Sequence, residues 1–324
     1  MRRLVRIALA TVLALAIMGL VGLTAMRFVV TSRSWPIMAA AFASYAVLGF
    51  VVTLAVSLLL LRGTRHRSWV LAAVVASAVG VAAHLYWSGP LYVGGGGRPD
   101  LVVMSANLEF GHGDAATVVR TAASRDVDVL VLQEVTPQVN SALERAGLSR
   151  LFPHHVGQPA HGASGTMVFS HFQVAEILPL TLGNGGLDVR VATIVPFRLL
   201  AVHTAQPVKG PVAWRRDLGV LRERARAAVH EGPTLAIGDF NATQDHALFR
   251  RVLGEGMRDA AEEAGSGWQP TWPSKWRGTS PRPLVALDHV LTSNGFTAVR
   301  TSTIEVPHTD HLALVVEVRT GSDD

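Results

Sequence analysis

The sequence predicts a layered α/β sandwich that follows three transmembrane helices. Two features of the first 90 residues point to the helices: three long apolar stretches carry no charge, and all 24 acidic residues of the chain come later. After residue 100, short apolar runs alternate with helical patterns, and the expected strands outnumber the expected helices. Roughly 230 residues remain after residue 90, which is enough for one domain with a sizeable core.

The first three elements are expected to cross the membrane. The stretches Ile7–Met26, Pro36–Leu61 and Trp69–Trp87 hold 20, 26 and 19 residues. About 20 apolar residues are needed to span roughly 30 Å of hydrocarbon. The first stretch is longer than the apolar core of a signal peptide, which has about 7–15 residues, and no A-x-A cleavage site directly follows it. Residues 1–90 are therefore predicted to form a multi-pass domain in the plasma membrane.

The distribution of arginine predicts the orientation of this membrane domain. With the N-terminus in the cytoplasm, six arginines lie on the cytoplasmic side: Arg2, Arg3, Arg6, Arg62, Arg65 and Arg67. Three then lie outside: Arg27, Arg33 and Arg98. Because cytoplasmic loops carry the excess of Lys and Arg, we expect a cytoplasmic N-terminus. Three crossings then place the domain after Trp87 on the extracytoplasmic side.

The charges argue against a nucleic-acid-binding protein, although the net charge is +5. Residues 1–90 carry eight arginines and no acidic residue, whereas the rest of the chain carries 21 basic and 24 acidic residues, a net charge of −3. Because Lys and Arg contacts to phosphates drive affinity for nucleic acid, we do not expect it to be a partner. Cysteine is absent, which excludes disulfides and thiolate metal sites.

Residues 91–100 are predicted to be a glycine-rich linker. They contain four consecutive glycines, Gly94–Gly97, which is typical of a flexible tether and not of a packed element. The soluble domain is expected to cover residues 101–320, and residues 321–324 form a tail.

The soluble domain is expected to contain eight strands and four helices. The strands are Leu101–Ala106, Val127–Leu132, Thr166–Ser170, Val189–Val195, Leu199–Val202, Thr234–Ile237, Val285–Leu287 with Val290–Leu291, and Leu312–Val318. The helices are Ala115–Ser124, Gln138–Ala146, Pro211–His230 and His246–Val252. Pro211 suits a first helical turn, and Gly232-Pro233 ends the long helix.

Several of these strands end at once in a chemically capable side chain. These side chains are Asn107, Gln133 with Glu134, His203, Asp239 with Asn241, and Asp288 with His289. One such residue at a strand end is common, since loops are polar. Five strand ends of this kind in one domain indicate that one rim of the sheets collects an active site.

The motifs that carry these residues resemble those of the endonuclease/exonuclease/phosphatase superfamily, the DNase-I-like phosphodiesterases and phosphatases. They occur in the order Ser105-Ala-Asn107-Leu, Leu132-Gln-Glu134-Val, Val202-His203-Thr, Gly238-Asp239-Phe-Asn241, Leu287-Asp288-His-Val and Thr309-Asp310-His311. The resemblance covers about residues 100–319 and implies a four-layer α/β sandwich. One departure is that His171 stands where the family usually has Arg or Lys after a strand.

The resemblance also implies the roles of the site residues. Glu134 is the expected ligand of Mg²⁺ or Mn²⁺, with Asn107 and Asp310 close to the metal or its waters. Asp239 orients or deprotonates the attacking water, and Asn241 bonds the phosphate or positions Asp239. His311 contacts the phosphoryl group while Asp288 accepts its other N–H, which favours the imidazolium. His203 is either a phosphate contact or a proton donor.

Two further features leave alternatives open. The loop Trp268–Arg282 holds Trp268, Trp272 and Trp276 and is either an edge of the core or an anchor in the lipid interface. Lys209, Arg215 and Arg216 are either phosphate contacts or, together with later arginines, the solvated face of the long helix.

The predicted function is a membrane-anchored, metal-dependent phosphohydrolase. Its three N-terminal helices and exported catalytic domain resemble bacterial teicoplanin-resistance-associated phosphatases, which implies a phosphate or pyrophosphate substrate on a polyprenyl lipid of cell-wall synthesis. The membrane lipid bilayer and a phosphorylated lipid are the expected partners. The alternatives are a surface-tethered endonuclease or phosphodiesterase acting on nucleic acid, and a binding module that kept the fold without the activity.

Overall fold

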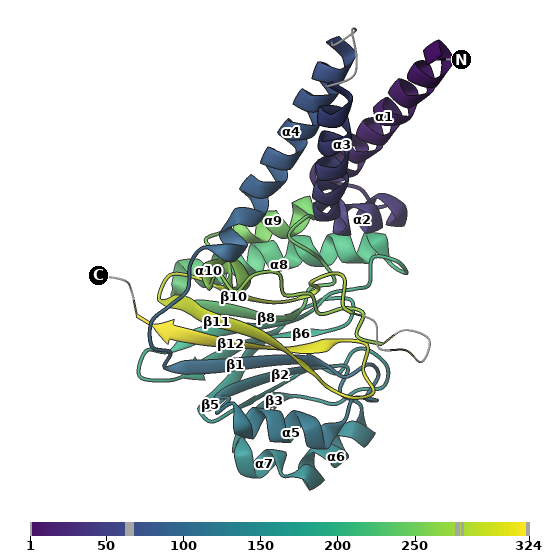
Figure 1. The fold of residues 1–324 in the computed structure, drawn as a ribbon. Coiled ribbons are helices and arrows are strands. Elements are labelled where there is room, and N and C mark those ends of the chain that lie inside the picture. The colour runs from purple at the N-terminus through teal and green to yellow at the C-terminus, as the bar shows by residue number, and fades with distance from the viewer. Residues whose placement is uncertain (1, 62–67, 276–278, 280–281, 322–324) are drawn as a thin grey trace.

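The computed structural model describes residues 2–61, 68–275, 279 and 282–321. Two six-stranded sheets pack face to face, and helices cover the outer face of each sheet (Figure 1). The predicted four-layer α/β sandwich is therefore confirmed.

The first sheet contains the strands nearest the start and the end of the domain. Its order is β11 (Phe296–Glu305), β12 (Leu312–Thr320), β1 (Leu101–Asn107), β2 (Val129–Gln133), β4 (Met167–Ser170) and β3 (His154–Gly157). Its outer face is covered by α5 (Ala115–Ser124), α6 (Pro137–Ala146) and α7 (Leu148–Leu151).

The second sheet contains the strands from the middle of the domain. Its order is β5 (Gln173–Pro179), β6 (Gly186–Ala192), β7 (Phe197–His203), β8 (Thr234–Asp239), β10 (Asp288–Thr292) and β9 (Arg258–Asp259). Helices α8 (Pro211–Glu231) and α9 (Ala247–Leu253) cover its outer face, and the short helix α10 (Ala260–Glu263) follows β9.

The central strands have both faces buried, which explains their nearly continuous apolar sequences. In β1, Val103 points into the core between the sheets, whereas Met104 points toward α5. In β2, Val131 likewise points into the core between the sheets, and Leu130 points toward the outer helices. Each strand thus belongs to two hydrophobic cores, which holds its carboxyl end in a fixed position.

The four helices predicted in the soluble domain match the structure within one residue at each end. Asp114 caps α5 by accepting a hydrogen bond from Thr117 N at 2.7 Å. Thr136 caps α6, and Pro137 follows in its first turn. The strands β3, β5, β9 and β11 were not predicted, and the segment Val285–Leu287 forms one bridge between Val285 and Trp272 instead of a strand. Strand β5 lies at an edge with most residues exposed, so it lacks an apolar pattern.

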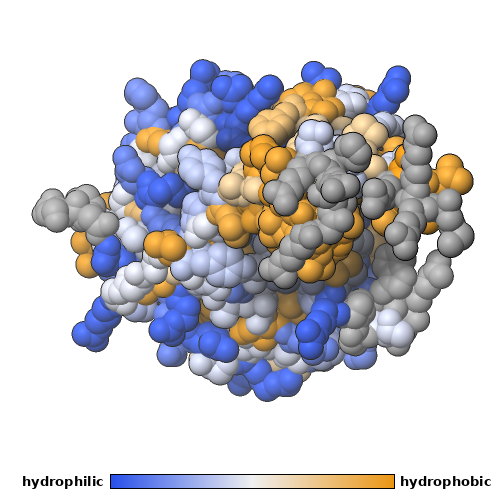
Figure 2. Space-filling view, turned by 45° about the horizontal axis from the view of Figure 1, so that its top comes forward, coloured by the Kyte–Doolittle hydropathy of each residue, from blue (hydrophilic) through white to orange (hydrophobic). Residues whose placement is uncertain are grey.

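Three helical segments are long and apolar enough to cross a membrane: Ile7–Phe28, Ala43–Leu61 and Ser68–Tyr92. They contain α1 (Arg2–Ala25), α3 (Ala46–Leu61) and α4 (Ser68–Ser88), which project from the side of the domain that carries α8 and α9 (Figure 1). In Figure 2, hydrophobic residues gather on these projecting helices and hydrophilic residues surround them. Within the described part of the chain, the three predicted apolar helices are therefore present, and each could cross a membrane.

The prediction was wrong in treating residues 36–61 as one span. The helix breaks at Phe42, and the separate helix α2 (Ser34–Ala41) precedes a 3₁₀ turn at Ala43–Tyr45. Ile37 of α2 is 3% exposed and belongs to the hydrophobic core under α8 and α9. The apolar side chains of α2 are therefore explained by packing against the soluble domain.

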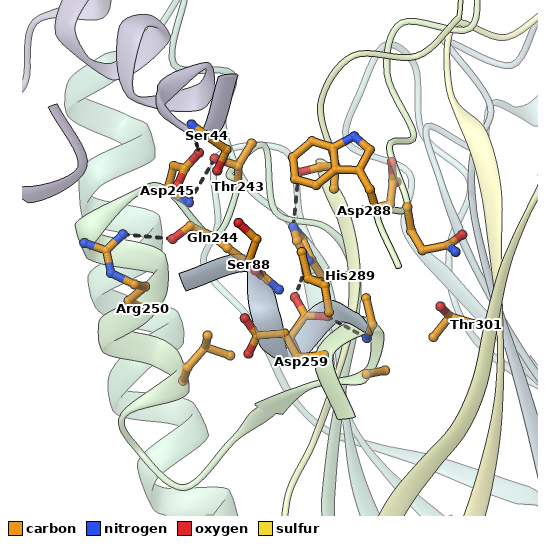
Figure 3. Close-up of a pocket in the computed structure, with 18 of the residues that line it drawn as sticks. Ser44, Ser88, Thr243, Gln244, Asp245, Arg250, Asp259, Asp288, His289 and Thr301 are labelled. Atoms are coloured by element: carbon orange, nitrogen blue, oxygen red, sulfur yellow. Dashed lines mark hydrogen bonds and ion pairs between the residues drawn. The ribbon is translucent and has the colours of Figure 1, made fainter. Parts of the chain in front are cut away.

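Polar contacts also join the membrane helices to the soluble domain. Asp245 forms a buried ion pair with Arg27. It also accepts a hydrogen bond from Ser44 N at 2.9 Å (Figure 3). His246 Nε2 lies 2.9 Å from Ile37 O, and Arg250 donates to Arg27 O at 2.6 Å. A cavity of about 280 Å³ lies at this junction.

The glycine linker differs from the flexible tether that its sequence predicted. Gly95 N donates a hydrogen bond to Glu263 O at 3.0 Å. A Cβ at Gly95 would lie 2.1 Å from Ala264 O, and one at Gly94 would lie 2.6 Å from Glu263 O. Both glycines have positive φ angles, of +73° and +146°. These glycines are needed because the chain passes close to the backbone that ends α10.

Candidate active site

Strand register brings the predicted site residues together at one rim of the two sheets. In the second sheet, Asp239 at the end of β8 is the partner of His203 in β7 and of Asp288 in β10. In the first sheet, Asn107 at the end of β1 is aligned with Gln133, which directly precedes Glu134. Gly238 has to be glycine, because a Cβ there would lie 2.0 Å from Val202 O of the adjacent strand.

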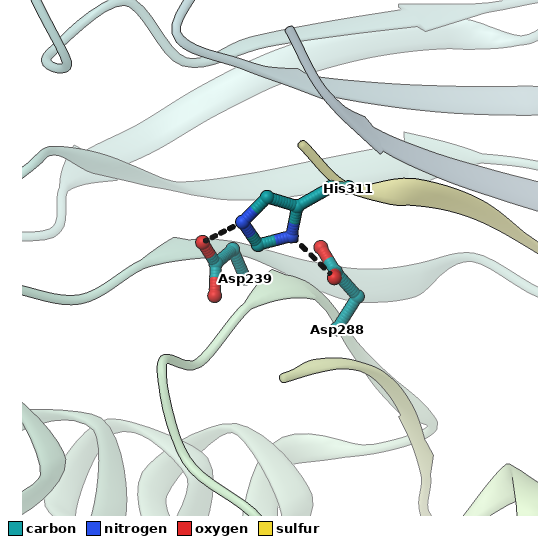
Figure 4. Close-up of side chains that lie close together, drawn as sticks. All are labelled: Asp239, Asp288 and His311. Carbon is teal, nitrogen blue, oxygen red and sulfur yellow. Dashed lines mark hydrogen bonds and ion pairs between the residues drawn. The ribbon is translucent and has the colours of Figure 1, made fainter. Parts of the chain in front are cut away.

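The centre of the site is a chain of two carboxylates and one imidazole. His311 Nδ1 lies 2.8 Å from Asp288 Oδ2, and its Nε2 lies 3.8 Å from Asp239 Oδ2 (Figure 4). Burial opposes the charge on His311, but Asp288 and Asp239 outweigh it and raise the pKa of His311 to about 10. The predicted pairing of His311 with Asp288 is present, and the ring is an imidazolium at neutral pH.

A second group of contacts joins the two sheets. The amide of Asn107 donates to Glu134 Oε1 at 3.3 Å and to Asp239 Oδ2 at 3.1 Å. The other oxygen of Glu134 accepts a hydrogen bond from Phe110 N at 2.6 Å. Burial raises the pKa of Glu134, and it raises the pKa of Asp239 to about 7. Both carboxylates are therefore held in a site that disfavours uncompensated negative charge.

Two of the site residues have positive φ angles, which are uncommon for residues other than glycine. Glu134 has a φ of +58° and Asn241 a φ of +46°. Asn241 N donates to Asp239 Oδ1 at 2.7 Å, and its amide donates to Thr204 O at 3.0 Å. The hydrogen bond that Phe110 N donates to the Glu134 carboxylate likewise holds Glu134 in its conformation. Such conformations cost about 1–3 kcal/mol and are concentrated at functional sites.

His203 is completely buried beside these carboxylates. Its Nε2 lies 3.7 Å from Glu134 Oε1, 3.7 Å from Asp239 Oδ2 and 3.3 Å from the Asn184 amide. Burial and the charged His311 lower the pKa of His203 to about 3, so the ring is neutral. A neutral ring that accepts a hydrogen bond from Asn184 favours a positioning role over proton donation.

Asp310 lies at the edge of the site. Its Oδ1 is 3.9 Å from His311 Nε2, and its Oδ2 accepts a hydrogen bond from Trp272 Nε1 at 3.0 Å. The prediction did not include Trp272 or Asn184 among the site residues. Trp272 belongs to a tryptophan-rich loop for which the sequence indicates no single role. Nothing in the sequence around Asn184 distinguishes it.

In its described part, the tryptophan loop contacts both the membrane domain and the active site. Trp268 makes an edge-to-face contact with Tyr45 of the membrane domain, and Trp272 contacts Asp310. Trp276 lies outside the described residues.

Most arginines of α8 pair within the protein, as Arg222 does with Glu255, while Lys209 lines the active-site cavity.

The donor atoms fit a hard divalent cation. Glu134 Oε1 and Asp239 Oδ2 converge on the Asn107 amide, and both come from buried carboxylates whose pKa values burial raises. A second possible group is Asp239, Asp288 and His311, whose ligand atoms all lie within 4.8 Å of one another. In that group His311 is hydrogen-bonded to Asp288 and carries a positive charge. A protonated imidazole has no free lone pair and cannot ligate a metal. The oxygen donors around Glu134 are therefore the better fit.

A cavity of about 270 Å³ opens onto these residues. Its polar lining includes Glu134, Asn241, Asp310 and His311. Part of its wall comes from the membrane domain, through Met38, Ala41 and Phe42. The site is thus built from both sheets and from the segment between the first two membrane spans.

Comparison with known proteins agrees with this architecture. A profile of the family described as Endonuclease/Exonuclease/phosphatase family matches residues 104–323. No curated protein sequence matches the chain.

Several solved structures have a similar fold. One is an endonuclease/exonuclease/phosphatase family protein from Bacteroides thetaiotaomicron, with 15% identity and a TM-score of 0.52, covering 68% of this chain and 98% of that one. The mannosyl-6-phosphatase of the same organism has 14% identity and a TM-score of 0.52, covering 68% and 99%. TDP2 of D. rerio in complex with a single-strand DNA product has 17% identity and a TM-score of 0.54, covering 68% and 99%. These likenesses show the fold.

Proposed function

Because the chain belongs to the endonuclease/exonuclease/phosphatase family, we propose that it is a membrane-anchored, metal-dependent hydrolase of phosphoester or pyrophosphate bonds in a membrane lipid. The proposed lipid is a polyprenyl carrier of cell-wall synthesis. One observation supports the lipid assignment above the others: Met38, Ala41 and Phe42 of the membrane domain share a cavity with Glu134 and His311. A substrate in that cavity is already at the membrane.

The proposed chemistry assigns one task to each side chain. Glu134 would hold Mg²⁺ or Mn²⁺, with Asn107 and Asp310 close to the metal or its waters, and the cation would neutralise charge on the phosphoryl group. Asp239 takes the proton of the attacking water, for which a pKa of about 7 is well suited. Asn241 fixes the Asp239 carboxylate through its backbone N–H. The His311 imidazolium binds a phosphoryl oxygen while Asp288 holds its ring.

The substrate is tested by comparing three compounds with the full chain in detergent micelles. We expect turnover of a polyprenyl pyrophosphate to exceed that of a soluble phosphomonoester and of duplex DNA. The net charge of −3 in the domain after residue 90 disfavours long polyanions. Efficient cleavage of DNA with the lipid left intact would establish the nuclease alternative instead.

The pH profile follows from the two shifted groups. Asp239 must be deprotonated to act as a base, so activity should rise as pH increases through about 7. His311 must stay protonated, so activity should fall as pH increases through about 10. The measurement is kcat/KM from pH 5 to 11 at saturating Mg²⁺. A flat profile between pH 5 and 8 would contradict the assigned base.

The orientation of the domain can be tested with single cysteines, because the chain has none of its own. We propose that the catalytic domain is extracytoplasmic and that the N-terminus, at the far end of the apolar helix α1, is cytoplasmic. Ile194→Cys, at a fully exposed position of the domain, should react with a membrane-impermeant maleimide in intact cells. The matched control Leu4→Cys, 72% exposed near the N-terminus, should react only after lysis. The reverse pattern would place the domain in the cytoplasm.

A further inference from the structure

We infer that α2 is the specificity element of the enzyme, and that Met38, Ala41 and Phe42 bind the first hydrocarbon units next to the phosphate of the lipid. This inference rests on the proposed function and goes beyond it. It assigns a binding site for the chain of the substrate, in addition to the site for its phosphate. It also explains why α2 lies against the soluble domain instead of crossing the membrane.

The first step of the argument is that α2 is fixed at the cavity from two sides. His246 Nε2 lies 2.9 Å from Ile37 O, and the Ile37 side chain is buried in the core under α8 and α9. On the other side, the Tyr45 hydroxyl donates to Leu284 O at 2.7 Å, and its ring packs against Phe42 with centroids 6.1 Å apart. The residues facing the cavity are therefore held in place without a ligand.

The second step is that both polar and apolar residues line the cavity. Acidic and imidazole side chains, which would act on a phosphate, line the same cavity as a set of apolar residues. The apolar residues are Met38, Ala41, Phe42, Phe110, Pro207, Val208, Val285 and Leu287. A substrate that fits both parts has a phosphate attached directly to hydrocarbon. Glu109, Gln206 and Lys209 also line the cavity. Hydroxyl groups of a sugar phosphate or nucleotide that lay against Met38 and Phe42 would lack partners, and burying them there is unfavourable.

The third step is the position of α2 relative to the bilayer. Residues 34–42 lie between the membrane spans Ile7–Phe28 and Ala43–Leu61, at the ends of those spans that face the soluble domain. Trp35 of α2 and Phe28 just before it are exposed, at 66% and 62%. Aromatic side chains are typical of the membrane interface. A hydrocarbon chain leaving the cavity past α2 thus enters the bilayer at once, and keeping it out of water favours binding.

The test uses the full chain and two substrates, a polyprenyl pyrophosphate and a small aryl phosphate. Ala41→Trp should fill the apolar part, and Met38→Gln should make it polar at similar length. Each should lower the ratio of kcat/KM for the lipid to kcat/KM for the aryl phosphate by at least about 10-fold, with KM for the lipid rising. The control is Leu48→Trp, at a position of α3 that is 63% exposed, and it should leave the ratio unchanged.

The outcomes separate this inference from the proposed function. If the wild-type protein hydrolyses the lipid and both variants keep its ratio, α2 does not bind the chain, and the proposed function stands. A loss of both activities in equal proportion in both variants would show a structural role for α2 and would also overturn the inference. If the wild-type protein hydrolyses no lipid phosphate, the proposed function itself fails.

Discussion

Replacing Glu134 by Gln, Asp239 by Asn or His311 by Gln is expected to lower turnover by about 100-fold or more. Each change keeps the size of the side chain and removes the charge or the proton acceptor that the proposed chemistry uses. Loss of single groups of this kind typically costs factors of about 10² to 10⁴. The measurement is kcat with a polyprenyl pyrophosphate, together with thermal unfolding to show that the fold is retained.

The controls for this result separate catalysis from general effects of charge. Glu176→Gln changes an exposed carboxylate of β5 away from the site and should leave turnover unchanged. A chelator in excess should abolish activity of the wild-type protein, and Mg²⁺ or Mn²⁺ should restore it. Full activity in the chelator would contradict the role of Glu134 as a metal ligand.

The second large effect is expected at the junction between the membrane helices and the domain. Asp245→Ala should destabilise the protein by about 3–5 kcal/mol, because Arg27 would remain buried without its partner. The side chains of Arg27 and Asp245 are 8% and 3% exposed, so the Arg27 guanidinium would lose its charged partner in a largely buried position. The Ser44 N–H would also lose its acceptor. The measurement is the free energy of unfolding of the full chain in detergent.

Two further variants show whether the buried pair is the cause. Glu223→Ala removes the carboxylate of an exposed pair with Arg226, and its effect should be no more than about 1 kcal/mol. The double variant Arg27→Met, Asp245→Leu removes both charges and should recover most of the stability lost in Asp245→Ala. If Asp245→Ala unfolds like the wild-type protein, the contact of Asp245 with Arg27 contributes little.

Elements with local signals were predicted well, and elements stabilised only by their neighbours were not. Helix α5 begins at a capping aspartate and α8 begins at a proline, so their starts are written in the local sequence. Strand β11 mixes threonine, serine and arginine with apolar residues and is formed by pairing with β12 along nearly its whole length. Helix α2 is as apolar as a membrane span, and only its contacts with α8, α9 and His246 distinguish it.

The same reasoning separates the parts of the site that the sequence predicts from the parts that it does not. The motifs around Asn107, Glu134 and Asp239 lie at strand ends, and strand register brings them together. The pairing of His311 with Asp288 followed from the resemblance, and the structure has it at 2.8 Å. The cavity wall formed by Met38 and Phe42 depends on contacts between segments about 200 residues apart, which no local pattern records.

The junction at α2 also sets the order in which the protein can be assembled. Ser44 and Ile37 leave the ribosome about 200 residues before their partners Asp245 and His246 are made, with separations of 201 and 209 residues. During that interval the membrane helices are inserted while Arg27 and the polar backbone of α2 still lack these contacts. The inserted membrane helices therefore lack these contacts until Asp245 and His246 have been made, and their final arrangement forms only when the second sheet and α9 fold onto α2.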